Sequence, residues 1–469
     1  MGGKCMSKRK IREKIGNELA VAVSVVCMTA VFATCWNNFY IGKMETPFFN
    51  IGNWFLILLF AVLYRLLAEV FQTFRISVKG VFELAYSQML ALFITNSIMY
   101  IIIVLLCRGL QTVLPLLLSL MTESLIAIIW SVSVHKLYFY VHPPKRTAII
   151  WDARKGINEL INLYGNENRY KVEKSVKAKS CLDDIADCLD GFDAVFLSGV
   201  HSHDRNKIIK YCVEHGIDAY IIPRVGDMIM SAAKPLYLFN LPVVKLERFN
   251  PSIWYLLYKR LGDIFVSSIA LIILSPIMLV VAVIIKATDG GTVLYRQCRL
   301  TIDGKKFDVL KFRSMRMDAE KDGVARLSTG AADDRITPIG RFIRAVRIDE
   351  LPQLINILKG DMSIVGPRPE RPEIFEEYVK EMPEFALRLQ TKAGLTGLAQ
   401  VYGRYNTTPY DKLLMDLSYI ANPSLARDFI ICLATIKILF LPESTEGIAV
   451  GATNAMSEPI YGKKLKKIE

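Results

Sequence analysis

The sequence predicts a membrane α-helical bundle followed by two α/β domains, and three observations support this fold class. Apolar segments fill the first third of the 469-residue chain. Short apolar strands then alternate with polar amphipathic stretches, and a Pro-broken apolar segment precedes a strongly charged C-terminal region. We therefore expect four N-terminal transmembrane helices, a Rossmann-like α/β domain, and a C-terminal α/β domain with a re-entrant membrane helix.

The composition narrows the class of protein and its partners. Hydrophobic residues make up 52% of the chain, more than soluble proteins usually carry. The net charge of +13 fits cytoplasmic membrane flanks, anionic lipid or phosphorylated substrates. No basic helix or base-stacking motif stands out, so we expect no nucleic-acid partner. The nine cysteines are scattered without a CxxC pair or metal-ligand spacing, a pattern typical of a reducing compartment.

Residues 1–142 are expected to form the four-helix transmembrane region. The apolar segments cover roughly residues 19–36, 54–70, 84–107 and 113–134, and each approaches the length that crosses a bilayer as a helix. Basic residues gather before the first segment, between the second and third, and after the fourth, so the positive-inside rule places both ends in the cytoplasm. No small-residue cleavage site follows the first segment, so we expect no cleavable signal peptide.

Charged residues inside these segments are costly in lipid and should face other helices. They are Arg65, Glu69 and Glu123. Arg65 and Glu69 lie one helical turn apart and are spaced to pair. A structural ion pair or interfacial snorkelling accounts for these residues better than transport does.

Residues 143–250 are expected to form a small parallel α/β domain of Rossmann type. The chain after the first strand lacks the G-x-G-x-x-G phosphate loop, which argues against a dinucleotide site and favours a scaffolding or regulatory role. The expected strands are Ala148–Trp151, Ala194–Leu197 and Ala219–Ile222, and the expected helices are Lys155–Leu163 and Asp204–His215.

The segment Ile264–Ile285 contains 22 consecutive residues without a charge, which as a straight helix measures about 33 Å. Ser275-Pro276 falls at its centre, where proline removes a helix hydrogen bond. Basic residues flank both ends, which disfavours a spanning helix. We therefore expect a re-entrant helix, with a spanning helix as the alternative. The Ser275 hydroxyl is placed to satisfy backbone groups that the bend frees.

The charged C-terminal region begins with an expected β-hairpin. Asp303-Gly304 reads as the turn and Phe307–Phe312 as the second strand. Lys311 and Arg313 lie two residues apart, hence on one face of that strand. Paired cations suit a diphosphate, although a solvated strand face is the better explanation when this pair is taken alone.

Ile348–Pro369 is the most informative stretch of the chain. Asp349 and Glu350 begin a short amphipathic helix, and a Gly-Pro-Arg-Pro turn follows at Gly366–Pro369. Carboxylates near an arginine, in a backbone that prolines hold rigid, suit magnesium-assisted attack on a phosphate. Alone, an acidic pair is weak evidence, because helix N-termini favour acidic residues.

Three arginines are expected to form one side of a helix beside Asp349, where they would bind lipid headgroups or hold a phosphate. Their spacing is three residues, at Arg341, Arg344 and Arg347.

Several motifs follow one another in order along residues 259–440. They are Lys259-Arg260-x-x-Asp263, Ser275-Pro276, Lys311-Phe312-Arg313-Ser314-Met315, Asp334-Arg335-Ile336-Thr337, Asp349-Glu350-Leu351-Pro352-Gln353, Gly366-Pro367-Arg368-Pro369 and the stretch from Gly394 to Val401. With these motifs, residues 259–440 resemble the bacterial sugar transferase superfamily, the monotopic phosphoglycosyl transferases. The apolar segments and α/β domain that precede them resemble the long form of this family, which starts exopolysaccharide, capsule or O-antigen repeat units.

The resemblance implies transfer of a sugar-1-phosphate from a UDP-sugar to polyprenyl (undecaprenyl) phosphate with release of UMP. It implies that Asp349 is the nucleophile, forms a covalent phosphosugar and binds Mg²⁺, with Glu350 as its dyad partner. Resemblance to the long-form relatives also implies a homodimer in the bacterial cytoplasmic membrane. Its catalytic domain, residues 251–442, is then expected on the cytoplasmic face.

Other motif residues receive roles from the same resemblance. Arg344 and Arg368 match arginines that hold phosphate oxygens, and the paired cations Lys311 and Arg313 are the further candidates for phosphate binding. The turn at the nucleotide site consists of Gly366, Pro367 and Pro369. Contact with membrane lipid at the interface falls to Lys259, Arg260, Asp263, Ser275 and Pro276. Residues 443–469 read as a basic polar tail touching anionic lipid or solvent.

Two positions depart from the family pattern and bear on local loop shape or donor choice. Asp289-Gly290-Gly291-Thr292 replaces the usual Gly-Pro, and Thr301 stands where glycine is usual after Gln297 and Arg299.

The rival functions are a non-catalytic membrane scaffold or sensor for a polysaccharide assembly system, and a lipid-phosphate phosphatase. The intact dyad and arginines disfavour the scaffold, and no Asp-x-Asp-x-Thr motif supports the phosphatase.

Overall fold

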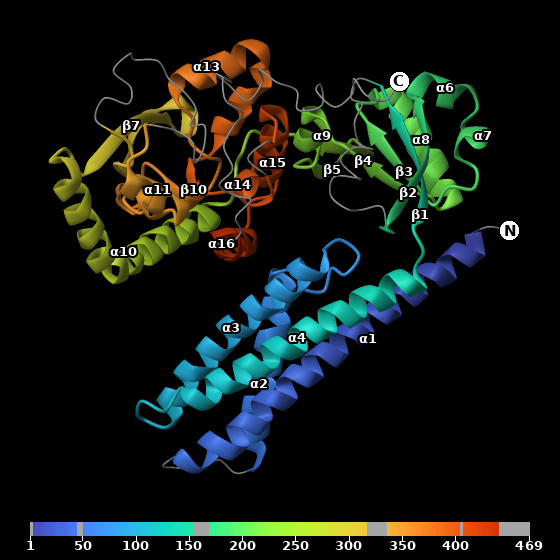
Figure 1. Cartoon of the computed structure of the whole chain (residues 1–469). Coiled ribbons are helices and arrows are strands. Elements are labelled where there is room, and N and C mark those ends of the chain that lie inside the picture. Colours follow the sequence, from blue (N-terminus) through green and yellow to red (C-terminus); the bar gives the residue numbers. More distant parts are fainter. Residues whose placement is uncertain (1–2, 45–49, 153–167, 317–334, 404–406, 440–469) are drawn as a thin grey trace. The chain divides into compact units, whose positions relative to one another are not determined.

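The computed structural model describes residues 3–44, 50–152, 168–316, 335–403 and 407–439 (Figure 1). The chain divides into two compact units, Met1–Ile222 and Pro223–Glu469. The helix predicted at Lys155–Leu163 and the tail at residues 443–469 lie outside the described residues.

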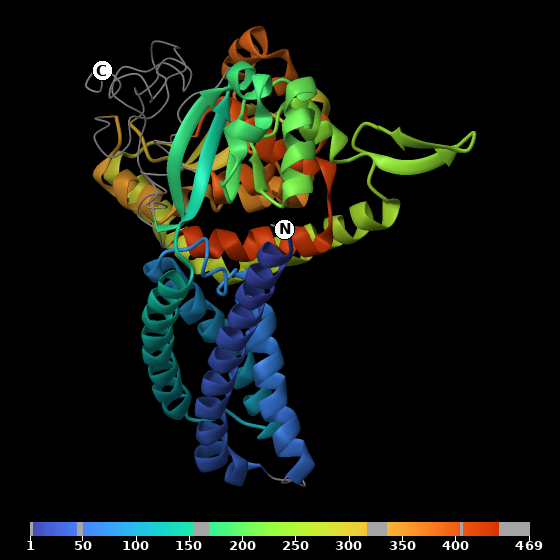
Figure 2. The same ribbon diagram turned by 90° about the vertical axis from the view of Figure 1, so that its right-hand side faces the viewer.

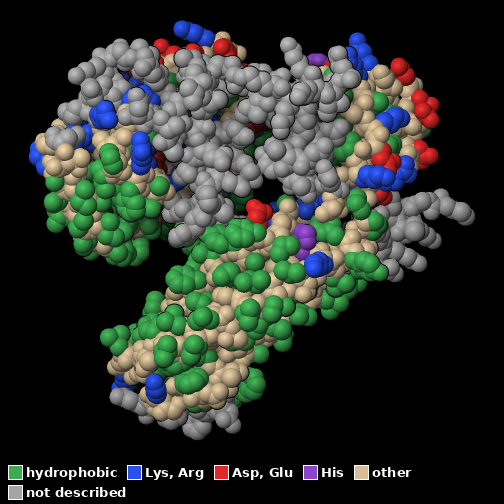
Figure 3. Space-filling view, in the orientation of Figure 1, with side chains coloured by type: hydrophobic (Ala, Val, Ile, Leu, Met, Phe, Trp, Pro, Cys, Tyr) green, Lys and Arg blue, Asp and Glu red, His purple; other side chains and the backbone are tan. Residues whose placement is uncertain are grey.

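Long apolar helices begin the N-terminal unit, as the sequence predicts. Each contains a segment long and apolar enough to cross a membrane. They pack lengthwise against one another, and hydrophobic side chains cover much of their outer surface (Figures 1 and 3). These helices are α1 (Gly3–Cys35), α2 (Asn50–Val70), α3 (Val81–Leu106) and α4 (Leu114–Val141), and α1 is extended by η1 (Trp36–Tyr40) and η2 (Ile41–Lys43).

The charged residues of this bundle behave partly as predicted. Glu123 on α4 is fully buried and accepts a hydrogen bond of 2.6 Å from Asn96 Nδ2 on α3. Arg65 Nη1 lies 3.4 Å from Glu69 Oε2, which confirms the predicted pair. The expectation that Glu69 faces other helices is wrong, because its side chain is 70% exposed next to the last residue of α2.

A parallel sheet follows in the same unit, with strand order β2-β1-β3-β4. It confirms the three predicted strands and the helix predicted at Asp204–His215. Strand β2 was not predicted, because its alternating charged residues read as a polar loop, whereas the structure pairs it at the sheet edge. The elements are β1 (Lys145–Trp151), β2 (Tyr170–Lys177), α6 (Ala178–Asp183), α7 (Ile185–Leu189), β3 (Ala194–Ser198), α8 (Ser202–His215) and β4 (Asp218–Ile221).

The C-terminal unit begins with helix α9 (Val225–Met230) and a hairpin of strands β5 (Lys234–Leu238) and β6 (Leu241–Lys245). Helix α9 packs against α15 (Pro409–Ala421), so these residues group with the C-terminal unit rather than with the preceding sheet. The hairpin strands pair only with each other among the described strands, and the hairpin projects from the unit (Figure 2).

Helix α10 (Ile253–Asp289) contains the predicted membrane segment and changes direction along its length (Figure 1). Pro276 has no N–H, so the carbonyl of Ile272 loses its helical partner. Ser275 Oγ donates to that carbonyl at 2.8 Å. The predicted role of the Ser275 hydroxyl is therefore confirmed. The second half of the helix packs through Val281 and Ile285 on the domain that follows.

The rest of this unit contains the predicted antiparallel hairpin. The core forms around Val365, Tyr378, Phe385 and Leu413. The elements are β7 (Leu294–Leu300), η4 (Ile302–Gly304), β8 (Lys306–Phe312), α11 (Pro338–Ala345), η6 (Ile348–Glu350), α12 (Gln353–Lys359), β9 (Ser363–Val365), α13 (Pro372–Glu381), η7 (Pro383–Gln390), β10 (Gly394–Thr396), α14 (Leu398–Tyr402), α15 and α16 (Leu425–Leu439).

Candidate active site

The acidic pair lies on a short 3-10 turn between two helices. Thr337 caps the start of α11, where its Oγ1 accepts from Gly340 N at 3.0 Å. The helix ends at Ala345, and Arg347 then takes the left-handed conformation with φ of 56°. The prediction that three arginines share one helix side is therefore wrong for Arg347. Its backbone reverses the chain and presents Asp349 and Glu350 immediately before α12.

Glu350 is held ionised by two cations. Its Oε1 lies 3.0 Å from Arg368 Nη2 and 3.4 Å from Lys311 Nζ. Burial favours the neutral acid, but Arg368, Lys311 and Arg347 together outweigh it and lower the pKa of Glu350 below its usual range. The same burial lowers the pKa of Lys311, which Glu350 counteracts. The pair and Arg368 therefore form one compact charged group.

Asp349 differs from its neighbour. Burial and the negative charge of Glu350 raise its pKa, against the opposing charges of Lys311 and Arg344. None of the residues that the structure describes forms a hydrogen bond or ion pair with its carboxylate. The site thus combines an ionised, partnered carboxylate at Glu350 with an available one at Asp349.

The donor set at the dyad suits a hard cation. The described part of the chain contains no cluster of three or more His, Cys, Asp or Glu side chains placed to hold a metal, so the protein's own ligands there would be fewer than three. Mg²⁺ commonly binds through one or two carboxylates, completing its shell with water and substrate phosphate oxygens. The available carboxylate of Asp349 fits that role, whereas Glu350 Oε1 is already engaged by Arg368 and Lys311.

The Gly-Pro-Arg-Pro turn passes unusually close to strand β10. Gly366 N donates to Thr396 O at 2.8 Å, and Gly394 N donates to Pro367 O at 2.9 Å. A Cβ atom on Gly394 would lie 2.1 Å from Gly366 N, and one on Gly397 would lie 2.1 Å from Gly366 O. These glycines are therefore required for the backbone approach that positions the turn.

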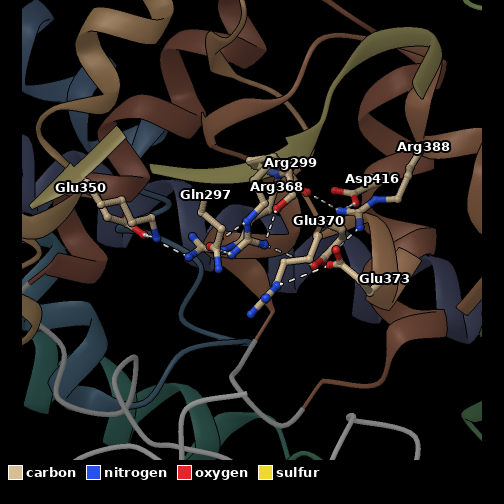
Figure 4. A network of polar contacts seen from close by, with 11 residues as sticks. Gln297, Arg299, Glu350, Arg368, Glu370, Glu373, Arg388 and Asp416 are labelled. Carbon is tan, nitrogen blue, oxygen red and sulfur yellow. Dashed lines mark hydrogen bonds and ion pairs between the residues drawn. The ribbon is translucent and has the colours of Figure 1, made fainter. Parts of the chain in front are cut away.

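The buried Arg388 and the half-buried Arg299 contact the backbone of the same turn (Figure 4). Arg388 Nη2 donates to Arg368 O at 3.0 Å, and Arg299 Nη1 donates to Pro369 O at 3.0 Å. Glu370 lies between them, with Oε1 3.2 Å from Arg388 Nη1 and Oε2 3.9 Å from Arg299 Nη1. Asp416 Oδ2 lies 2.7 Å from Arg388 Nη2.

The sequence did not predict functional positions for Arg388 and Glu370. The only signal available was their charge, because a buried arginine needs carboxylate partners. Sequence does not show which arginine is buried. Burial raises the pKa of Asp416 to about 6, although Arg388 opposes the rise.

Helix α10 is joined to α12, which follows the dyad, and to β9, which precedes the Gly-Pro-Arg-Pro turn. Arg260 donates to Ile357 O at 2.6 Å and Leu358 O at 2.8 Å, which caps the end of α12. Asp263 accepts from Ser363 Oγ at 2.8 Å and from Ile364 N at 3.0 Å on β9. Arg260 and Asp263 therefore fix α10 to the two elements that lie between the dyad and the Gly-Pro-Arg-Pro turn.

Lys259 also has a protein partner, at 2.8 Å from Asp428 Oδ2 on α16. The position of these three residues and of Ser275 and Pro276 at a lipid interface stays a prediction.

The two cations predicted on strand β8 separate. Lys311 joins the dyad, whereas Arg313 follows the end of the strand and is 8% exposed. Its guanidinium lies where a Cβ on Gly291 would be, 2.0 Å from Arg313 Nη1. A glycine at position 291 thus leaves room for the Arg313 guanidinium. Asp334 of the predicted motif lies outside the described residues.

Comparison with known proteins places these features in a family. The family model described as bacterial sugar transferase matches residues 254–442. A UDP-glucose:undecaprenyl-phosphate glucose-1-phosphate transferase of Klebsiella pneumoniae is 41% identical over 257 residues, covering 53% of each chain. A protein of the same name from Caulobacter vibrioides is 40% identical over 193 residues, which are 40% of this chain and 72% of that relative.

A UDP-N-acetylgalactosamine-undecaprenyl-phosphate N-acetylgalactosaminephosphotransferase of Aeromonas hydrophila is 35% identical over 236 residues, 50% of this chain and 55% of that relative. The chain thus spans about half the length of the Klebsiella and Aeromonas relatives and nearly three quarters of the Caulobacter one. The motifs around the dyad and the turn lie inside the matched region. The chain belongs to the bacterial sugar transferase family.

Proposed function

We propose that this chain transfers a sugar-1-phosphate from a UDP-sugar to undecaprenyl phosphate and releases UMP. The names of the relatives support this reaction class, because each names a UDP-sugar and undecaprenyl phosphate. The observation that best supports the proposal is the carboxylate of Asp349, which is available beside Glu350. Arg368 and Lys311 hold Glu350 in its ionised form. That arrangement offers a nucleophile and cations for phosphate oxygens in one group.

In the first step, a carboxylate oxygen of Asp349 attacks the sugar-proximal phosphorus of the donor. The bond from that phosphorus to the bridging oxygen breaks, and UMP leaves with the bridging oxygen and its electron pair. A phosphosugar remains bonded to Asp349. Arg368, Lys311 and Arg344 reduce the repulsion between the carboxylate and the diphosphate. Mg²⁺, when bound at Asp349, supplies further neutralisation of the phosphate oxygens.

In the second step, a phosphate oxygen of undecaprenyl phosphate attacks the same phosphorus. The bond to Asp349 breaks, and the carboxylate is restored with its electron pair. The product is an undecaprenyl-diphosphate sugar. Direct attack of undecaprenyl phosphate on the donor would bring two anions together in one displacement. Covalent catalysis replaces that displacement by two steps, and the same cations neutralise charge in both.

The proposal also includes a membrane arrangement. The N-terminal helices would span the bacterial cytoplasmic membrane, while α10 enters, bends at Pro276 and returns to the cytoplasmic face. The Ser275 hydrogen bond to Ile272 O supports the bend, because it satisfies the carbonyl that proline frees. A water-soluble donor and a lipid acceptor then meet at one interface. Homodimerisation is part of the same proposal.

The decisive experiment measures UMP release from a panel of UDP-sugars with Mg²⁺ and undecaprenyl phosphate. Asp349→Asn removes the nucleophile with little change of shape and is expected to abolish release. Asp308→Asn is the matched control, because Asp308 is an exposed aspartate on β8. Without acceptor, the intact mass of the wild type should increase by one phosphosugar. Normal release by Asp349→Asn would refute the covalent role of Asp349.

A further inference from the structure

The Gly-Pro-Arg-Pro turn carries Arg368, but its own backbone is fixed by groups from distant parts of the chain. Arg388 comes from η7 and Arg299 from β7, and they donate to the consecutive carbonyls of Arg368 and Pro369. The side chain of Arg388 is 4% exposed and that of Arg299 is 17% exposed. One buried and one half-buried arginine thus contact adjacent carbonyls of one turn (Figure 4).

The carboxylates around these arginines explain why they can be buried. Glu370 interacts with both arginines, and Asp416, which is 2% exposed, pairs with Arg388. Gln297 Oε1 accepts from Arg299 Nε at 3.1 Å and from Nη2 at 2.6 Å, which leaves Nη1 directed to Pro369 O. Side-chain partners therefore fix the orientation of each arginine, in addition to its hydrogen bond to the turn.

Arg368 connects the buried arginine Arg388 to the dyad. Arg388 binds the carbonyl of Arg368, and the guanidinium of Arg368 binds Glu350 Oε1 at 3.0 Å. Arg368 itself is exposed, with 43% of its side chain accessible, so packing around its side chain does little to hold it. Its position depends on the backbone of the turn.

We propose that Arg388 and Arg299 are positioning residues, which act on the reaction through Arg368 by fixing the backbone of its turn. This inference rests on the proposed function for its catalytic consequence. Neither arginine needs to touch the donor. A planar guanidinium can bind a carbonyl and a carboxylate at once, which a lysine ammonium on a flexible stem does less well.

Arg388→Lys is the informative variant, because it keeps the buried positive charge beside Asp416 and Glu370. Loss of the charge-assisted hydrogen bond to Arg368 O is expected to lower kcat/KM for the UDP-sugar about tenfold or more, mainly through kcat. In an Arg368→Ala background, the same substitution should cost less than about twofold, since residues that act as a unit are not additive. Equal losses in both backgrounds would overturn the proposal.

The matched control is Arg427→Lys. Arg427 also donates to a main-chain carbonyl of the same unit, Ser418 O at 2.7 Å, and to Ser418 Oγ at 2.9 Å. Among the described residues, the hydrogen bonds of the Arg427 side chain go to Ser418 and Asn422, and none goes to Arg368 or Arg388. Its effect, large or small, should therefore be the same with and without Arg368→Ala.

Amide hydrogen exchange tests the positioning without relying on activity. In the full-length protein, Arg388→Lys should speed exchange of Gly366 N and Gly394 N, which hydrogen-bond across the turn. Arg427→Lys should leave both unchanged, and Arg299→Lys should reproduce the effect of Arg388→Lys. Unchanged exchange in folded Arg388→Lys would overturn the proposal. Absence of UMP release from wild type would instead refute the proposed function, while the exchange result would still decide the positioning role.

Discussion

Replacing Gly394 with alanine tests the close approach between β10 and the Gly-Pro-Arg-Pro turn. The added Cβ would lie 2.1 Å from Gly366 N, 2.5 Å from Thr396 O and 2.6 Å from Gly366 Cα. All three neighbours are backbone atoms, so no flexible side chain can yield. Restoring an ordinary contact with Gly366 requires the turn and β10 to separate by roughly 1 Å, and the contact with Thr396 O requires a change of backbone within β10 itself.

The cost follows from this separation. Overpacking of this kind costs about 1–3 kcal/mol, and each strained backbone hydrogen bond across the turn adds about 1 kcal/mol. We therefore expect a loss of roughly 2–4 kcal/mol in the free energy of unfolding of the C-terminal unit. Arg368 moves with the turn, and a misplacement of about 1 Å can cost about 100-fold in rate.

The assay compares thermal unfolding in detergent and UMP release for wild type, Gly394→Ala and Gly226→Ala. Gly226 is the control, because a Cβ there meets nothing within 4 Å and the residue lies in helix α9. Alanine at Gly226 should be neutral or stabilising by up to about 1 kcal/mol. Wild-type stability and activity in Gly394→Ala would refute the argument from backbone contact.

Three further changes test other parts of the structure. Glu350→Gln removes the negative charge that raises the pKa of Asp349, so the acidic limb of the residual kcat/KM profile should move to lower pH; an unmoved limb would contradict this coupling. Asp416 has a folded pKa of about 6, above its unfolded value, so wild-type stability should fall by up to about 1.4 kcal/mol per pH unit as pH rises from about 4 to 6. Asp416→Asn should lack that slope in thermal melts at several pH values. Pro276→Leu should favour a spanning helix, whereas tags after residue 286 that stay wholly cytoplasmic would refute this expectation.

Features that depend on neighbouring residues were predictable from the sequence. The turn at Asp303-Gly304, the role of Ser275 beside Pro276 and the pair Arg65–Glu69 each follow from a few adjacent positions, and the structure contains all three. Local chemistry decides these features, because glycine, proline and helical spacing restrict the backbone directly.

Features that depend on distant partners were not predictable. Arg388 reaches Arg368 O, and Asp263 reaches the backbone of β9, across many intervening residues. Strand β2 has too few apolar residues to be distinguished from a polar loop without its neighbour β1. Arg347 reads as a helical residue by spacing, but the chain reversal before Asp349 requires its left-handed conformation. In each case tertiary contacts override local propensity.

The attachment of α10 to the site fixes the rotational phase of the whole helix. Arg260 and Asp263 lie one turn apart and contact α12 and β9, respectively, so this face of α10 cannot rotate without breaking both contacts. Each residue of an α-helix advances about 1.5 Å and 100°. Insertion of a single residue between Asp263 and Pro276 would therefore turn the bend by about 100° relative to the dyad, while seven residues would nearly restore its direction. The number of residues between Asp263 and Pro276 therefore sets the direction in which α10 continues after the bend.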